Sequence, residues 1–252
     1  GQASDALQSG APAMDEWHAA QAGFRGDWGH SGNTLTVQGD AYKNTLASTP
    51  QGPGIADGGN LLGRWERALS PDSGFQIQVY GDRVLRKIPG LFAVRTDTLD
   101  VDVQGHLSLG PRNALVWGGG YRSMDDHMQN SATVAVLPAH QILGLSNIFL
   151  QDTLSLVPER LDLTLSAKLE HNDFTGTEFL PDARLAWKPA AGQLLWAAAS
   201  RAVRTPSPFD SEFYEPGNPP YLLSGGPYFK SEIVEAYQLG YRLQAPSGFS
   251  LS

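Results

Sequence analysis

The chain alternates apolar and polar side chains along many short segments. From Leu161 to Glu170, every odd position is leucine or alanine and every even position is polar or charged. Because successive side chains of a β-strand point to opposite faces, this pattern predicts a strand with one apolar face and one polar face. The pattern alone leaves two environments open for the apolar face: the core of a soluble sandwich, or the lipid around a membrane barrel.

Similar segments recur through the whole chain, and no helical period of useful length competes with them. Clusters of Gly, Pro, Asn and Asp separate the segments and are typical of turns. We therefore predict an all-β fold of about twelve strands, at residues 23–28, 34–46, 60–69, 75–87, 92–104, 114–123, 145–156, 161–170, 179–188, 193–203, 232–243 and from 249 onward.

The connections between these segments alternate between short and long. Short ones such as "SPDSG" and "VPER" are typical of hairpin turns, and longer ones are predicted at 47–59, about 88–91, 124–144, 171–178 and 204–231. Consecutive connections of a meander lie at opposite ends of the sheet, so the short turns are expected at one end and the long loops at the other. Outer-membrane barrels have this arrangement, with short periplasmic turns and longer extracellular loops.

Aromatic residues lie close to the predicted short turns. In an outer-membrane barrel, aromatic side chains at this level form a girdle at the periplasmic membrane interface. The residues expected in such a girdle are Trp28, Phe75, Trp117, Trp187 and Trp196.

The composition narrows the class of protein. Only 17% of the residues are charged, whereas an average soluble protein has roughly 25%, and no apolar run approaches the roughly 18–20 residues of a membrane-spanning helix. A net charge of −8 argues against a nucleic-acid partner. The absence of cysteine excludes disulfides and thiolate metal sites.

Several stretches resemble the barrel of TonB-dependent outer-membrane receptors. They include "FLQDTLSLVPERLDLTLSAKLEHNDFTG" with its Gln151–Asp152 pair, and "PDARLAWKPAAGQLLWAAASRAVRTPSPFD", which contains the Pro181–Trp187 and Ser200–Pro206 motifs. The later "KSEIVEAYQLGYR", the early "AGFRGDW" and "GGNLLGRWER" are also similar to this family. The resemblance covers most of the chain, and its motifs come in the family's order.

This resemblance implies an antiparallel up-and-down transmembrane β-barrel. Residues 1–252 would form a partial barrel of about 12 of the roughly 22 strands, without the plug domain, and residues 1–22 and 204–231 would be extracellular loops. The intact protein would lie in the outer membrane and take up a scarce ligand, with a ferric siderophore or related iron chelate as the expected one. Its partners would be that chelate, the lipid bilayer, and TonB acting through the plug; neither enzymatic activity nor a cofactor is expected.

Two alternatives remain open on the residues alone. One is a complete, smaller outer-membrane barrel, either a porin or a barrel enzyme. The other is a soluble all-β carbohydrate-binding or hydrolase domain. No catalytic signature such as His-Glu-x-x-His or Gly-x-Ser-x-Gly occurs in the chain, and neither does a dinucleotide-binding fingerprint.

Candidate ligand-binding residues lie in and beside the predicted loop 204–231. Exposed aromatic side chains on a long loop suit an aromatic or chelated ligand, and arginines at its mouth would attract an anionic chelate. The same aromatic residues would also serve to pack the loop, and the arginines would also pair with carboxylates of the plug or a neighbouring strand. The candidates are Arg201, Arg204, Phe209, Phe213, Tyr214, Tyr221 and Tyr228.

Two polar patterns contain residue types found in metal sites or in catalytic carboxylate pairs. The run Met124–Met128 offers two carboxylates, an imidazole and two thioethers, which are metal ligands. It falls in a predicted long loop, where polar runs are normally solvated, so no metal site is predicted there. Asp100 and Asp102 share one strand face, where a wet barrel lumen accounts for them. On the strand 161–170, the odd positions are expected to face lipid and the even positions the lumen and plug.

Overall fold

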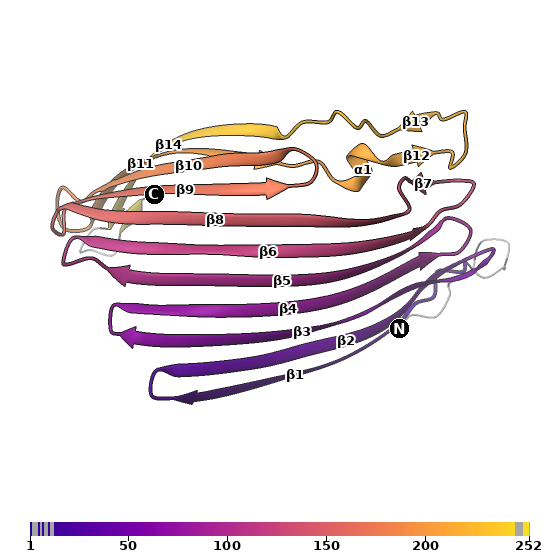
Figure 1. Cartoon of the computed structure of the whole chain (residues 1–252), viewed down its shortest axis with the longest axis horizontal. Helices are drawn as coiled ribbons and strands as arrows, with labels where there is room; N and C mark the ends of the chain where they lie inside the picture. The colour runs from indigo at the N-terminus through magenta and orange to yellow at the C-terminus, as the bar shows by residue number, and fades with distance from the viewer. Residues whose placement is uncertain (2–4, 6, 8–9, 11–12, 245–248, 252) are drawn as a thin grey trace.

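The computed structural model describes residues 1–252 except 2–4, 6, 8–9, 11–12, 245–248 and 252. Within that range the chain forms one large antiparallel sheet and a small sheet of three short strands (Figure 1). The strands of the large sheet are β1 (His18–His30), β2 (Asn33–Thr49), β3 (Gly52–Ser70), β4 (Ser73–Ile88), β5 (Phe92–Ser108), β6 (Asn113–Gln129), β8 (His140–Val157), β9 (Leu161–Asn172), β10 (Gly176–Trp187), β11 (Gln193–Arg204), β14 (Glu232–Gln244) and β15 (Ser250–Leu251).

The large sheet is an open up-and-down meander. Its strand order follows the sequence, and every neighbouring pair is antiparallel. The sheet curls, so that β14 and the C-terminal end lie behind β9 and β10 in Figure 1. Strands β1 and β15 each pair on one side only. All twelve predicted strands are confirmed, and most of them are longer than predicted.

The register assigns each side chain to one of two faces, because residues directly opposite each other on neighbouring strands share a face. Leu163 lies opposite Leu154 on β8 and Leu185 on β10. We call this the apolar face. Following the register from strand to strand assigns Val101 of β5 and Val79 of β4 to the same face. The polar face carries the alternate residues, including Asp100, whose carboxylate accepts a hydrogen bond from Arg122 at 2.9 Å.

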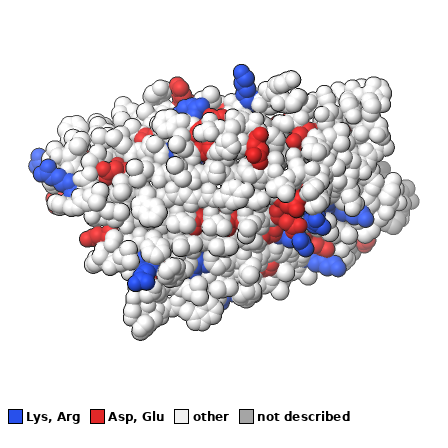
Figure 2. All heavy atoms as spheres, in the orientation of Figure 1, with Lys and Arg blue, Asp and Glu red and all other residues white. Residues whose placement is uncertain are grey.

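Among the residues that the structure describes, no second layer of protein covers either face of the sheet. The buried apolar side chains of the described chain are Ala93, Ala135, Val136 and Leu143, whereas Ile148 is 62% exposed and Leu239 is 77% exposed. In a soluble sandwich a second sheet would cover such leucine and isoleucine side chains. Figure 2 shows a mostly uncharged surface, with acidic and basic side chains intermixed where they occur.

Four of the five residues predicted for an aromatic girdle lie on the apolar face, and the fifth does not. The register places Trp28, Phe75, Trp117 and Trp187 on that face. Trp196 belongs to the polar face, because it lies opposite Ala186 and Gly240, one position out of step with Trp187. The strand 193–203 is almost uniformly apolar, so its sequence does not indicate which side chains share a face.

Several predicted long loops are wrong. The strands β2 and β3 are joined across residues 50–51 and β9 and β10 across 173–175, whereas the connection predicted at about 88–91 is found at 89–91. The segment 47–59 therefore belongs mostly to strands, although its glycines suggested a loop. Gly58 has a packing role there, since a Cβ at this position would lie 2.5 Å from the Tyr42 hydroxyl. The prediction of a loop over 1–22 also ends too late, because β1 begins at His18.

The two connections that are long fold onto each other. Residues 130–139 contain β7 (Ala135–Val136), and residues 205–231 contain α1 (Pro208–Ser211), β12 (Phe213–Glu215) and β13 (Leu223–Ser224). Strand β12 pairs with β7 on one side and β13 on the other. We call residues 130–139 and 205–231 the cap, and the end of the sheet that carries it the capped end, on the right in Figure 1. The predicted loop 204–231 is thus a folded element.

Glu212 joins the cap to the large sheet. Its backbone carbonyl accepts a hydrogen bond from the Leu137 N–H at 2.9 Å, and its carboxylate accepts one from Gln141 Nε2 at 2.6 Å. Burial raises the pKa of the Glu212 carboxyl; the bond from Gln141 lowers this pKa, and the nearby Asp126 carboxylate raises it further. Folding therefore shifts the protonation equilibrium of Glu212 toward the neutral form.

The first prediction concerns Glu212→Gln. A carboxyl whose pKa is raised on folding contributes most below its unfolded pKa of about 4.3, and this contribution is lost as pH rises through the folded pKa. A neutral glutamine still accepts the bond from Gln141. At neutral pH the variant should exchange the Leu137 amide hydrogen more slowly than the unmodified protein, and the difference should shrink toward pH 4.

Hydrogen exchange measured by mass spectrometry, corrected for intrinsic rates at each pH, tests this. Glu215→Gln is the matched control, because Glu215 lies exposed on the neighbouring strand β12. Equal protection of the Leu137 peptide at neutral pH in Glu212→Gln and the unmodified protein would refute the expectation.

The second prediction concerns two glycines of the large sheet. A Cβ on Gly118 would lie 2.6 Å from the Phe149 ring and 2.7 Å from the Val103 carbonyl oxygen, whereas a Cβ on Gly63 meets nothing within 4 Å. Gly118→Ala should lower the free energy of unfolding by about 1–3 kcal/mol, and Gly63→Ala should leave it nearly unchanged. Urea unfolding in lipid vesicles measures both; equal stabilities of the two variants would contradict the close packing.

Candidate functional site

The seven predicted ligand-binding residues lie at the capped end. Two are arginines near the C-terminal end of β11, and five are aromatic residues of the cap segment 205–231. The two arginines form ion pairs with carboxylates, and four of the five aromatic residues form ring pairs.

Arg204 closes the base of the long cap segment. Its Nη1 lies 2.9 Å from Glu232 Oε1 at the start of β14, and its Nη2 lies 3.1 Å from Asp210 Oδ2 in α1. The guanidinium therefore ties the last residue of β11 to both the helix and the returning strand. This is the ion-pairing alternative that the sequence left open for the arginines.

Asp210 is held in its ionised form at this junction. Its carboxylate accepts hydrogen bonds from the Ser207 backbone N–H at 2.8 Å and the Ser207 hydroxyl at 2.9 Å. These bonds lower the pKa of Asp210, and Arg204 lowers it further. Pro208 follows Ser207 at the first helical position, which suits its fixed φ. The local sequence Ser-Pro-Phe-Asp thus builds the turn that places Asp210 beside Arg204.

Arg201 links two strands and the end of the cap segment. Its Nη2 lies 3.3 Å from Glu178 Oε2 on β10, and its Nη1 donates a hydrogen bond to the Phe179 carbonyl. The other Glu178 oxygen accepts a hydrogen bond from the Ser231 hydroxyl. Arg201 is 25% exposed at its side chain, so its charge is already largely engaged within the protein.

The five aromatic residues form two pairs and one separate side chain. The Phe209 and Phe213 rings lie 5.7 Å apart between centroids, and the Tyr214 and Tyr221 rings lie 4.8 Å apart. Phe213 and Tyr214 are successive residues of β12, so their side chains point to opposite faces of the small sheet. The pairs are therefore separate, and Tyr228 stands apart from both with 90% of its surface exposed.

The cap presents a group of exposed apolar side chains. Phe209 is 64% exposed, Phe229 is 53% exposed and Leu222 is 92% exposed, in addition to Tyr228. Leu222 was not predicted from the sequence, because nothing local distinguishes an exposed leucine from a packed one.

The run Met124–Met128 belongs to strand β6 and not to a loop, which corrects the prediction. The strand continues because its residues pair with β5 and β8 up to the cap. Alternation places Asp125 and His127 on one face and Met124, Asp126 and Met128 on the other. Asp125 and His127 meet His140 of β8 instead of the methionines, and the potential ligand atoms of these three lie within 4.8 Å of one another.

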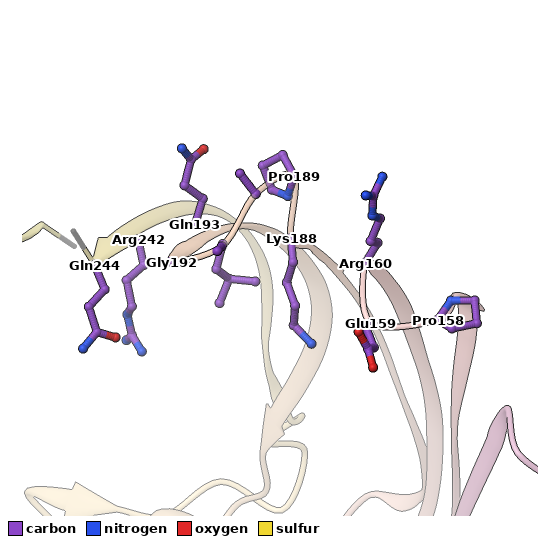
Figure 3. Close-up of a pocket in the computed structure, with 12 residues that line it drawn as sticks. Pro158, Glu159, Arg160, Lys188, Pro189, Gly192, Gln193, Arg242 and Gln244 are labelled. Atoms are coloured by element: carbon purple, nitrogen blue, oxygen red, sulfur yellow. The ribbon is translucent and has the colours of Figure 1, made fainter. Parts of the chain in front are cut away.

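A hollow of about 440 Å³ lies at the opposite end of the sheet, between the turns that join β8 to β9 and β10 to β11 (Figure 3). Glu159, Lys188 and Arg242 point to one side of it, while Arg160 points away. None of the seven predicted ligand-binding residues lines this hollow. In the part of the chain that the structure describes, no helix is long and apolar enough to cross a bilayer.

Comparisons with solved structures relate this fold to outer-membrane receptors. The chain is similar to the siderophore receptor PirA from Pseudomonas aeruginosa, with 14% identity and a TM-score of 0.59 over 91% of this chain and 49% of that one. It is also similar to the copper transporter OprC, with 13% identity and a TM-score of 0.71 over 96% of this chain and 44% of that one. The ferric enterobactin receptor PfeA matches at 14% identity and a TM-score of 0.53, over 91% of this chain and 49% of that one.

These likenesses show the fold, and the chain spans about half the length of the receptors it matches. No match was found among curated protein sequences. A family model, described as TonB dependent receptor-like, beta-barrel, matches residues 3–252. That model covers nearly the whole chain, and the open meander with one apolar and one polar face is part of such a barrel wall. The chain therefore belongs to the TonB-dependent receptor β-barrel family.

Proposed function

We propose that this chain forms barrel wall in an outer-membrane receptor that takes up a metal chelate by energy-coupled transport through TonB. The observation that carries the proposal is the arrangement of the large sheet. One face carries exposed apolar side chains on most of its strands, the other is polar and ion-paired, and a folded cap lies at one end. A transmembrane barrel wall requires these two faces.

The proposal sets the orientation of the chain in the membrane. The apolar face lies against lipid, and the polar face lines the lumen and meets the plug. The capped end faces the outside of the cell, because barrels of this kind carry their longer loops there. A ligand would then arrive at the cap and at the mouth formed by the ends of β10, β11 and β14.

The expected ligand is a ferric siderophore or a related iron chelate. The names of the similar solved proteins include siderophore receptors, a ferric enterobactin receptor and a copper transporter, so a metal or its chelate is the shared ligand class. The exposed side chains of Phe209 and Tyr228 suit contact with the flat aromatic groups of such a chelate. Arg201 and Arg204 hold the cap in place for this contact, since both are engaged by carboxylates.

The third prediction tests the transport function. A strain that lacks the full-length gene should grow poorly when one particular ferric siderophore is the sole iron source, and growth should return when the gene is restored. A medium with excess iron, in which growth does not depend on the siderophore, is the control. A copper-limited medium should be run in parallel. Unchanged growth of the deletion strain on every iron source would contradict iron uptake, and a defect confined to copper limitation would replace the ligand class.

The fourth prediction tests the cap residues. Replacing Tyr228 by alanine should weaken ligand affinity roughly tenfold, which corresponds to loss of about 1.4 kcal/mol from one aromatic contact. The stability of the Tyr228→Ala variant should equal that of the unmodified protein, because Tyr228 is 90% exposed. Tyr237→Ala is the matched control, since Tyr237 is 78% exposed on the apolar face of β14. Binding of the radiolabelled chelate to whole cells measures both; equal affinities for the two variants would remove Tyr228 from the site.

A further inference from the structure

Three side chains with metal-ligating atoms meet on the apolar face of the large sheet, at its capped end. Asp125 and His127 are two residues apart on β6 and so share a face, and His140 of β8 lies directly opposite His127 in the register. Ile142 lies opposite Asp125 on the same face and begins the apolar belt below them. All three backbone positions are fixed by the hydrogen-bonded ladder of two long strands.

The side chains converge on one point. His127 Nε2 lies 3.1 Å from Asp125 Oδ1, and His140 Nε2 lies 2.9 Å from the same oxygen. The two imidazole rings are stacked, with centroids 4.1 Å apart and planes inclined by 11°. Two ring nitrogens and one carboxylate oxygen therefore occupy three corners of a small triangle, and each side chain retains an exposed side toward solvent.

The charged neighbours of this cluster are engaged with one another. Asp97 lies opposite Asp125 on β5, and it forms ion pairs with both Arg83 and Arg95. Within the described residues, neither arginine forms an ion pair with Asp125. The ion-pair partners of Asp125 are the two histidines. The two guanidinium groups are thus paired with Asp97, and the oxygen of Asp125 faces the two imidazoles.

We propose that Asp125, His127 and His140 bind one divalent transition-metal ion of the class that prefers imidazole, such as Zn²⁺ or Cu²⁺. Two imidazole nitrogens and a carboxylate oxygen are a common ligand set for these ions, with water completing the coordination. Metal–ligand bonds of about 2.0–2.1 Å place ligand atoms roughly 3.3 Å apart in a tetrahedral site. The nitrogen–oxygen distances of 2.9 and 3.1 Å need to open by a few tenths of an ångström, and the stacked imidazole rings need to rotate so that the in-plane lone pair of each Nε2 points at the ion.

This site is separate from the path proposed for the transported ligand. Asp126 and Gln141, the intervening residues, belong to the polar face, where Gln141 contacts Glu212 of the cap. The metal cluster lies on the other side of the same strands and faces away from the lumen. Its location also suggests its effect, because β6 and β8 are the strands that the cap connection 130–139 joins. A bound ion would clip the base of that connection across the two strands.

The experiment uses the full-length protein in detergent, carrying no histidine tag and treated with a chelator. Isothermal titration with Zn²⁺ should show one site that His140→Ala weakens by more than about tenfold, and Asp125→Asn should weaken it in the same direction. With Cu²⁺, the electron paramagnetic resonance spectrum should show nitrogen hyperfine splitting that decreases in His140→Ala. Zn²⁺ should also slow amide exchange of residues 134–137 in the unmodified protein but not in His140→Ala.

His171→Ala is the matched control. His171 lies on the same face, near the capped end of β9, and forms a hydrogen bond with the Thr177 hydroxyl at 3.0 Å. It is not one of the proposed metal ligands. This variant should bind Zn²⁺ like the unmodified protein. The proposal is overturned if unmodified protein and His140→Ala titrate identically, or if His171→Ala removes the site as completely as His140→Ala. Because the readout is metal binding, its outcome is independent of whether the receptor transports an iron chelate.

Discussion

The fold depends above all on the ladder of backbone hydrogen bonds between antiparallel neighbours. In a bilayer no water is available to satisfy backbone groups, so every N–H and C=O within the membrane must find a partner in an adjacent strand. The meander meets this demand locally, because each strand pairs with the one that follows it. Once the ladder is set, the face of each side chain is also set, since a shift of one residue would exchange the two faces along a whole strand. The unpaired sides of β1 and β15 are the two places where the ladder still requires neighbours.

The same ladder explains how a sheet without a protein core holds its shape. Packing against a second layer is replaced by cross-strand contacts within the sheet, such as the Phe149 ring over Gly118 and the Trp117 ring over Gly105. On the polar face, pairs such as Arg122 with Asp100 connect directly opposite residues. Ion pairs of this kind add little individually where they are exposed to water. Their regular placement across strands nevertheless disfavours a shifted register, because a shift would move these charges to the apolar face.

Much of the large sheet could be predicted from the sequence, because the period of two is a local signal that each segment carries within itself. The connections could not, since glycine-rich stretches such as 52–59 serve equally as loops or as strand positions beneath an aromatic ring. Which one applies depends on the partner strand: Gly58 is a strand residue because Tyr42 lies opposite it. The cap was not predicted either, because its central pair joins Val136 to Phe213 and neither strand is long enough to show a period. The pairing of Arg201 with Glu178 likewise depends on the geometry of two strands and not on either segment alone.

The run Met124–Met128 shows how strand geometry redistributes chemistry that the sequence places together. As a loop, its five side chains would be free to surround one ion; as a strand, it places three of them on the polar face and two on the apolar face. The two on the apolar face gain a partner from β8, His140, which lies thirteen residues from His127 along the chain and directly across the ladder from it. A ligand set that looks complete in sequence is thus divided, and a smaller set is completed across strands. The ladder that separates the two faces thereby also decides which metal-ligating groups can meet, and it places Asp125, His127 and His140 where the cap connection leaves the sheet.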